Sequence, residues 1–218
     1  MTDATTIQLN LPQSLTAGEI VAVDVSHEQY MSDYAETHHE WVRGMVIKMS
    51  PVRLIHDQLV TYLRDLLRAY LSASGITGRV LSDPFVMRLP DSSRQPDLQV
   101  VLGDTMTKLQ DTFMNGPADI CIEVVSPGSV GTDYGEKLAE YEAGGVREYW
   151  IIDPQRKRCL FNRLDEGNLY ADAPVDGTGN YRTPLLPQFV LHVPGLWAET
   201  LPDYGAVWQA VQSMLAAD

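Results

Sequence analysis

The sequence predicts an α/β fold in which a mixed central sheet is flanked by helices. Short apolar runs rich in β-branched residues, at positions 96–102, 120–125 and 148–153, are typical of buried strands. Amphipathic helical patterns, around positions 51–74 and 133–143, separate these runs. The resulting order of helix, strands, helix and strand is that of a layered α/β domain, and 218 residues suffice for one such domain.

The N-terminal part predicts an arm, a short helix and a hairpin. We expect residues 1–25 to form an arm with little structure before Asp24. Ser26, followed by Gln29 three residues later, has the capping-box spacing and predicts a helix through Ala35. Residues 41–49 predict two short strands that turn at Arg43-Gly44.

A long helix and a strand are expected next. Ser50 is predicted to cap the helix, with Pro51 at its first position, and Gly75 to end it. Apolar residues recur along it at helical spacing: Ile55, Leu59, Tyr62, Leu63, Leu66, Leu67 and Tyr70. Residues 79–89 predict a strand that leads through a turn at 90–93 into the strand opened by Asp97.

The second half predicts a further helix, a buried strand and a C-terminal β extension. Residues 103–117 form a polar connection, and Gly144-Gly145 stops the helix that spans 133–143. Residues 158–163 and 167–170 predict a hairpin, 176–180 a loop and 189–193 a strand. We expect residues 26–200 to form one domain, with a C-terminal helix in 201–218 packed on it.

Composition indicates a cytoplasmic protein. No stretch reaches the ~20 apolar residues of a membrane span, and the first residues lack the basic and apolar regions of a secretory signal. We therefore expect no membrane partner. Cys121 and Cys159 lie in apolar strand-like runs, which favours reduced, buried thiols over a disulfide or a zinc site.

The net charge of -13 argues against nucleic acid as a partner, because non-specific binding relies on Lys and Arg that neutralise phosphates. A nuclease can still be acidic overall if a few basic side chains gather beside its cleft. The candidates are Arg43, Lys48, Arg53, Arg79, Arg88 and Arg94.

Asp97 and Glu123 are the main functional candidates. Asp97 opens one buried strand and Glu123 lies inside the next, where an ionised carboxylate is costly unless a cation or donor compensates it. Each alone could be structural, as a turn cap or the partner of an arginine. Two acids on neighbouring strands together suggest a divalent metal site.

A lysine on the following helix could complete this site. Asp133, Lys137 and Tyr141 are spaced i, i+4 and i+8 and share one helix face. Lys137 could reach Glu123, where it could hold an attacking water or offset charge on a phosphate. The alternatives are an exposed Lys137–Asp133 pair and a role for Asp133 as the helix N-cap, with Glu136 three residues on.

Several motifs occur in an order that resembles a known family. They are residues 40–44, 49–51, His56, Pro96-Asp97, residues 122–127, Asp133 with Lys137 and Tyr141, and residues 145–154. With these motifs, about residues 28–195 resemble the Uma-two (Uma2) family of restriction endonucleases. The resemblance implies the PD-(D/E)xK nuclease fold, a restriction-endonuclease-like mixed sheet that holds a metal ion where two strands fork.

The same resemblance assigns roles to individual residues. Asp97, Glu123 and the backbone carbonyl of Val124 would be metal ligands. The superfamily pattern has a lysine two residues after the second acid, where this chain has Val125; in the Uma2 type the lysine role moves to the next helix, which fits Lys137.

Four residues are expected as accessory groups. Glu40 and His56 match positions of the family, and Asp133 and Tyr141 share the helix face of the lysine. His56 also lies beside apolar positions, so a core histidine remains an equal alternative.

The predicted function is metal-dependent endonucleolytic cleavage of DNA. Oxygen ligands suit Mg²⁺ or Mn²⁺, whose bound waters can attack phosphorus. The residues support phosphodiester hydrolysis, and the resemblance implies DNA. A homodimer is one option, since its twofold axis matches that of DNA. The alternatives are an inactive nuclease-fold interaction module and, less favoured, an acid/base hydrolase that uses Asp97 and Glu123 as a carboxylate pair.

Overall fold

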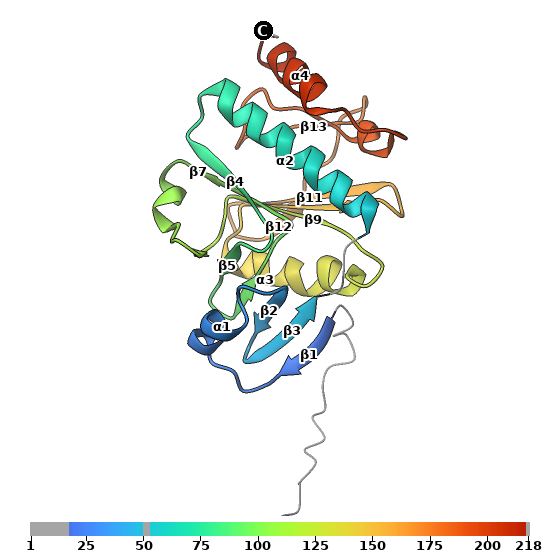
Figure 1. The fold of residues 1–218 in the computed structure, drawn as a ribbon. Coiled ribbons are helices and arrows are strands. Elements are labelled where there is room, and N and C mark those ends of the chain that lie inside the picture. Colours follow the sequence, from blue (N-terminus) through green and yellow to red (C-terminus); the bar gives the residue numbers. More distant parts are fainter. Residues whose placement is uncertain (1–17, 50–52, 217–218) are drawn as a thin grey trace, which may run out of the picture.

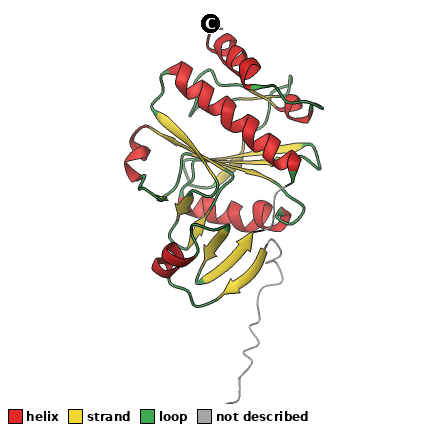
Figure 2. Ribbon diagram, in the orientation of Figure 1, coloured by secondary structure: helices red, strands yellow, loops and turns green. Residues whose placement is uncertain are grey.

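A mixed central sheet with a helix on each face forms the middle of the molecule (Figure 1). The structure is a computed structural model that describes residues 18–49 and 53–216. Helix α2 (Leu54–Ser74) covers one face of the central sheet, and helix α3 (Lys137–Gly144) lies on the other, between the central sheet and a second, smaller sheet (Figures 1 and 2). The predicted α/β class with a mixed sheet flanked by helices is thus confirmed.

The central sheet has the strand order β12-β11-β10-β9-β7-β4. Strand β9 is antiparallel to β7 and parallel to β10, which makes the sheet mixed. Its strands are β4 (Gly78–Ser82), β7 (Leu98–Leu102), β9 (Ile120–Val124), β10 (Glu148–Asp153), β11 (Arg158–Leu164) and β12 (Tyr170–Asp172). β7, β9 and β10 coincide with the three predicted apolar runs.

Each face of the central sheet has its own apolar core, because side chains alternate along each strand. The core under α2 includes Leu63 and Leu67 of the helix with Leu98 and Ile122 of the sheet. The core under α3 includes Val101, Cys121, Val125, Tyr141 and Tyr149. The long helix ends at Gly75, whose φ of 71° is left-handed, as the glycine there predicts.

The smaller sheet packs beneath α3, and helix α1 (His27–Asp33) connects its first two strands in the chain, β1 and β2. Its order is β1-β3-β2-β6-β5-β8. The strands are β1 (Gly18–Ala22), β2 (His39–Val42), β3 (Met45–Met49), β5 (Val86–Arg88), β6 (Ser92–Arg94) and β8 (Phe113–Asn115). Ser26 caps α1, since its side chain accepts a hydrogen bond from the Gln29 N–H at 3.1 Å. The hairpin turns at Arg43 and Gly44, both with positive φ.

The C-terminal part adds a two-stranded sheet and a last helix that packs against α2. The remaining elements are η1 (Gly103–Lys108), η2 (Thr132–Glu136), β13 (Asn180–Tyr181), β14 (Leu191–His192), η3 (Val193–Trp197) and α4 (Tyr204–Ala216). Val207 and Val211 of α4 are buried in the core under α2.

Three details differ from the sequence-based expectation. Residues 18–22, expected in the arm, form strand β1, because they pair with β3. Residues 79–89 form two strands in different sheets, since Pro84 has no N–H with which to continue a ladder. Helix α2 begins at Leu54, later than predicted, and Ser50 and Pro51 lie outside the described residues.

Both cysteines are free thiols. Cys121 is buried, whereas Cys159 is half-buried on β11, so the expectation of two buried thiols is correct for Cys121 alone. β11 lies next to the edge strand β12, and most of its residues are partly exposed, whereas every residue of β9 is buried. Among the helices of residues 18–49 and 53–216, none has both the length and the apolar character needed to cross a membrane.

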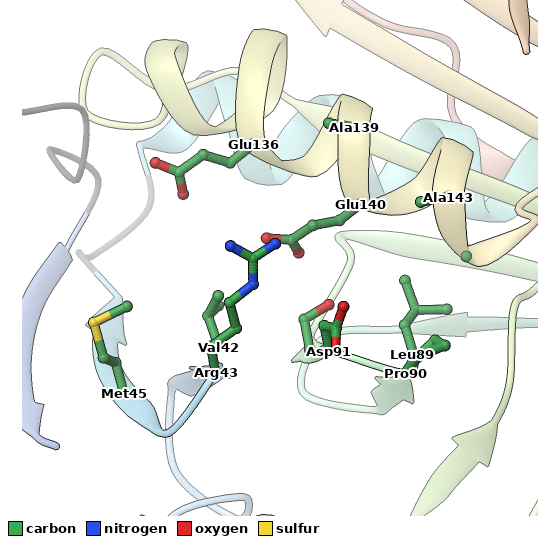
Figure 3. A pocket seen from close by; sticks show the side chains of 12 residues that line it. Val42, Arg43, Met45, Leu89, Pro90, Asp91, Glu136, Ala139, Glu140 and Ala143 are labelled. Atoms are coloured by element: carbon green, nitrogen blue, oxygen red, sulfur yellow. The ribbon is translucent and has the colours of Figure 1, made fainter. Parts of the chain in front are cut away.

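A pocket of about 520 Å³ lies between α3 and the smaller sheet (Figure 3). Its walls are the β2–β3 turn, the β5–β6 turn and the face of α3 and its N-cap that is turned to the smaller sheet: Val42, Arg43, Met45, Leu89, Pro90, Asp91, Ser92, Glu136, Ala139, Glu140, Ala143 and Gly144. The side chain of Arg43 extends from the hairpin toward α3.

Candidate active site

Asp97 and Glu123 lie on neighbouring strands at one end of the central sheet. Strands β7 and β9 are antiparallel, and Leu98 pairs with Ile122. Continuing this register by one residue sets Asp97 opposite Glu123. Because Ile122 points into the core under α2, its neighbour Glu123 points toward α3. Asp97, directly before β7, contacts His56 on α2. The two acids that the sequence analysis paired therefore meet at the fork of two strands.

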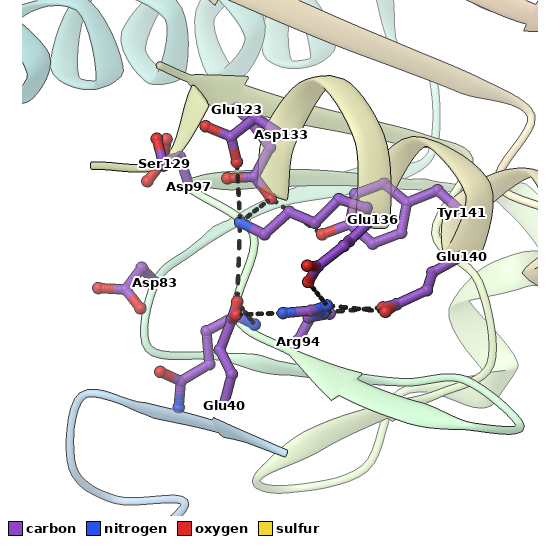
Figure 4. A network of polar contacts seen from close by, with 12 residues as sticks. Glu40, Asp83, Arg94, Asp97, Glu123, Ser129, Asp133, Glu136, Glu140 and Tyr141 are labelled. Atoms are coloured by element: carbon purple, nitrogen blue, oxygen red, sulfur yellow. Dashed lines mark hydrogen bonds and ion pairs between the residues drawn. The ribbon is translucent and has the colours of Figure 1, made fainter. Parts of the chain in front are cut away.

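Glu123 is a buried carboxylate that two donors hold by the same oxygen (Figure 4). The ammonium Nζ of Lys137 lies 2.9 Å from Glu123 Oε1, and the hydroxyl of Tyr141 donates a hydrogen bond of 2.9 Å to it. Within residues 18–49 and 53–216, no hydrogen bond reaches Glu123 Oε2. This second oxygen is thus available to a ligand.

Lys137 lies at the centre of three carboxylates. Besides Glu123, Asp133 Oδ1 lies at 3.4 Å and Glu40 Oε1 at 3.7 Å from its Nζ. The side chain is only 3% exposed, so the alternative of an exposed Lys137–Asp133 pair does not apply. Burial lowers the pKa of Lys137, but the charges of Glu123, Glu40 and Asp133 outweigh it and raise this pKa well above its ordinary value. Lys137 is therefore a cation and a hydrogen-bond donor, and cannot act as a base.

Asp133 reaches Lys137 from one turn earlier in the helical segment. It lies inside the π-helical turn η2, whose N-cap is Gly131, so Asp133 is not the N-cap. Its buried Oδ1 has no hydrogen-bond partner in the part of the chain that the structure describes. The ammonium of Lys137, at 3.4 Å, is its nearby cation.

Asp97 is held from two sides. Its Oδ2 accepts a hydrogen bond of 2.7 Å from the Val124 N–H and lies 3.0 Å from Nε2 of His56 on α2. Burial lowers the pKa of His56, but the hydrogen bond and charge of Asp97 outweigh this effect and raise it. Since the N–H and C=O of a strand residue point to the same side, the Val124 carbonyl faces the side of Asp97. His56 therefore contacts the site as well as bordering the core.

Glu40 enters the site from strand β2 of the smaller sheet. Its Oε1 accepts a hydrogen bond of 3.2 Å from the Gln95 N–H, and its Oε2 accepts one of 2.8 Å from Arg94. Burial raises the pKa of Glu40, but the charges of Lys137 and Arg94 outweigh it and lower this pKa. The group is thus an anion inside the protein.

Arg94 is the site residue that the sequence analysis misplaced. It was one of the basic candidates for a group beside the cleft, but its side chain is 1% exposed and pairs with Glu40 and Glu140. Strand β6 is buried at all three of its polar positions, Ser92, Ser93 and Arg94. A polar run directly before Pro96-Asp97 is the sequence signal that could have revealed it.

The acids of the site outnumber its cations. Burial raises the pKa of Glu123 well above its ordinary value; Lys137 opposes this rise, while Asp97, Asp133 and Glu40 add to it. Burial likewise raises the pKa of Asp133, against the charge of Lys137. Such an excess of buried carboxylate fits a hard divalent cation, which prefers oxygen ligands. No three His, Cys, Asp or Glu side chains in the described ranges already form a metal-binding group.

Comparison with known proteins gives the family. A family model described as "Putative restriction endonuclease" and named Uma2 matches residues 25–194. The chain belongs to the Uma2 family. The resemblance inferred from the motifs is thereby confirmed. A comparison with curated proteins found no match.

A solved structure shares the Uma2 chain's fold. It is described as a "putative nuclease belonging to DUF820" from Anabaena variabilis ATCC 29413. The TM-score is 0.66 at 16% sequence identity, and the match covers 78% of this chain and 96% of that one. The likeness supports the nuclease-like arrangement of sheet and helices.

The surroundings of Val125, the residue directly after β9, are unfavourable for a lysine. Val125 is buried in the core under α3, in the same cluster as Tyr141 and Tyr149. An ammonium at this position would lie among apolar and aromatic side chains, at a high desolvation cost. Lys137 reaches Glu123 from the helix instead.

Proposed function

We propose that this Uma2 protein is a metal-dependent endonuclease that hydrolyses phosphodiester bonds of DNA. One observation carries the proposal: the buried ion pair of Glu123 and Lys137, opposite Asp97 at the strand fork. A purely structural pair needs no further acids, yet Asp133 and Glu40 also surround this lysine. The family description supports the reaction, and DNA as substrate comes with it.

The residues fit a divalent metal ion by their chemistry. Asp97, Glu123 and the Val124 carbonyl would hold Mg²⁺ or Mn²⁺, because these ions take hard oxygen ligands. When bound, the ion would polarise the phosphate and lower the pKa of a bound water. His56 and the Val124 N–H keep Asp97 Oδ2 in place.

Lys137 would stabilise the charge that develops on the phosphate. Its raised pKa keeps it protonated, so it can donate hydrogen bonds to a phosphate oxygen or hold the attacking water. Tyr141 fixes the orientation of Glu123 through its hydrogen bond to Oε1. Asp133 and Glu40 hold the ammonium from the other sides.

Plasmid cleavage tests the proposal. The full-length protein with supercoiled plasmid and Mn²⁺ or Mg²⁺ should nick or linearise the DNA, and excess chelator should stop the reaction. Asp97→Asn and Glu123→Gln should each lower the rate by about 10²-fold or more, as loss of a group that acts at the transition state does. The exposed acid Asp104 supplies the control, since Asp104→Asn should cleave at the wild-type rate.

The alternative is a nuclease-fold interaction module. Two observations favour this module: the net charge of -13, and the ion pairs that Lys137 already forms with carboxylates of the chain itself. A wild-type protein that leaves supercoiled and single-stranded DNA intact with both ions would contradict the endonuclease and support the module. For a protein that does cleave DNA, sedimentation of its complex with a short duplex would decide whether one copy or a twofold dimer binds the DNA.

A further inference from the structure

Arg94 is a fully buried arginine that joins the smaller sheet to helix α3. Its Nη1 donates a hydrogen bond of 2.8 Å to Glu40 Oε2 on β2. Its Nε and Nη2 form a two-bond pair with Glu140 on α3, at 2.8 and 2.7 Å. Glu136, one turn earlier in the same helical segment, lies 3.7 Å from Nη2. Figure 4 shows the guanidinium between these acids.

These contacts fix the oxygen that faces Lys137. Because Arg94 occupies Oε2 of Glu40, Oε1 is the oxygen left for the Gln95 N–H and for Lys137 Nζ. The same guanidinium holds Glu140, one turn beyond Lys137 on α3. Arg94 therefore constrains both the carboxylate that faces the ammonium and the helix that carries it.

Burying a charged network is expensive, and a well-packed apolar cluster of similar volume is often as stable. A role confined to stability thus gives little reason for an arginine here. The two arms of the guanidinium reach different elements, which only a planar, multidentate group can do at once.

We propose that Arg94 is a positioning residue that keeps the Lys137 ammonium beside Glu123 Oε1, acting through Glu40 and through Glu140. It touches neither of the two acids at the strand fork. Only the kinetic part of its test rests on the proposed nuclease function; the positioning itself is a property of the folded chain.

Arg94→Lys is the informative substitution. It keeps the charge, but a single ammonium cannot bond Glu40 and both oxygens of Glu140 together. The matched control is Arg163→Lys: Arg163 Nε also bonds a buried glutamate, Glu148 Oε1, at 2.9 Å, in a network around Tyr181 and Thr183 away from the site.

The first measurement is the reactivity of Lys137 toward an acylating reagent, followed site by site by mass spectrometry on the native full-length protein. Wild type and Arg163→Lys should leave this 3% exposed amine unmodified while surface lysines react. Arg94→Lys should increase its modification at least about tenfold, because the ammonium loses its fixed neighbours and opens to solvent. Equal protection of Lys137 in all three proteins would overturn the proposal.

The second measurement separates turnover from binding. In an active wild type, Arg94→Lys should lower kcat by about 10-fold to 10²-fold with KM nearly unchanged, as expected from misplacing a catalytic group by about 1 Å. Arg163→Lys should keep the wild-type kcat. An unchanged kcat for Arg94→Lys in an active enzyme would also overturn the proposal. If wild type is inactive, the labelling still decides about Arg94, and only the proposed function fails.

Glu140→Gln serves where Arg94→Lys does not fold. Glu140 lines the pocket of Figure 3, and its side chain is 16% exposed whereas that of Arg94 is 1% exposed. The Glu140→Gln substitution breaks only the ion pair between Arg94 and α3. Lys137 should again become more reactive toward the acylating reagent than in wild type. If Lys137 stays fully protected in a folded Glu140→Gln variant, Arg94 does not position Lys137 through Glu140.

Discussion

At the scale of single residues, Lys137 acts as the neutralising centre of the site. It lies within ion-pair distance of Glu123, Asp133 and Glu40, and all four side chains are buried. Its loss would therefore affect more than a reaction rate, because breaking a buried ion pair leaves uncompensated charge inside the protein.

Lys137→Met should lower the free energy of unfolding by about 3–5 kcal/mol near neutral pH. The loss should be smaller at about pH 5 than at about pH 8. Glu123 and Asp133 already have raised pKa values in the folded protein, and without Lys137 these would rise further. A carboxyl with a raised folded pKa stabilises the fold in acid and loses that contribution as pH rises through the raised value.

Urea unfolding followed by circular dichroism at the two pH values measures this difference. The exposed lysine of β3 provides the control: Lys48→Met should change stability by less than about 0.5 kcal/mol at either pH. A Lys137→Met variant whose deficit is the same at both pH values would contradict the buried charge cluster.

The thiols should react in a fixed order. Burial raises the pKa of both Cys121 and Cys159, the latter to about 12, and so suppresses the reactive thiolate in each. Half-buried Cys159 should be modified by a thiol reagent before Cys121, and both far more slowly than in urea. Mass spectrometry of partly labelled native protein gives the order, and modification of Cys121 first would contradict the packing of β9.

At the scale of elements, α3 depends on how it begins and ends. The π-helical turn η2 leads directly into Lys137, and Gly145 ends the helix with a left-handed φ of 84°. The Gly145 N–H bonds back to the Glu142 carbonyl at 3.1 Å. The turn η2 thus precedes the start of α3 at Lys137, and Gly145 fixes its end.

Gly145→Ala should destabilise the protein by about 1–2 kcal/mol, because an L side chain is strained in the left-handed region. A Cβ there would meet only Pro117, at an ordinary 3.8 Å, so the backbone is the main cause. Gly177→Ala is the control, since this loop glycine has no positive φ and no atom within 4 Å of its Cβ position. Thermal unfolding should separate the two variants, and equal melting temperatures would argue against the cap.

At the scale of the whole molecule, the site joins three layers. Glu40 comes from the smaller sheet, Lys137 from α3, and Asp97 with Glu123 from one end of the interior strands β7 and β9 of the central sheet. A divalent ion at the strand fork would bind the folded protein alone and so stabilise all three layers together.

Mn²⁺ should raise the melting temperature of the wild type, by an amount equivalent to about 2.7 kcal/mol at a concentration 100 times its Kd. Asp97→Asn, which keeps an oxygen to accept the Val124 N–H, should show little or no rise. Asp104→Asn should respond as the wild type does. Calorimetry with and without Mn²⁺ measures the shift in melting temperature. An equal rise for Asp97→Asn would show that the ion binds somewhere other than the strand fork.

Much of this arrangement could be predicted from the sequence, because local patterns specify strands and helix faces. The apolar runs around Asp97 and Glu123 predicted the central strands β7 and β9. The spacing of Asp133, Lys137 and Tyr141 predicted that the three share one helix face. Arg94 could not be placed in this way. Its burial depends on β6 joining the smaller sheet beneath α3, which is a long-range contact with no local periodicity.

The distribution of the site along the chain also has a consequence for protein synthesis. A chain that emerges from the ribosome carries Glu40, Asp97 and Glu123 before it carries Lys137, and β9 lacks its parallel neighbour until β10 has followed. Domains fold as units during synthesis, so a nascent or prematurely ended chain has the acids of the site but no ammonium among them. In a nuclease, such fragments would be harmless to the DNA of the cell that makes them.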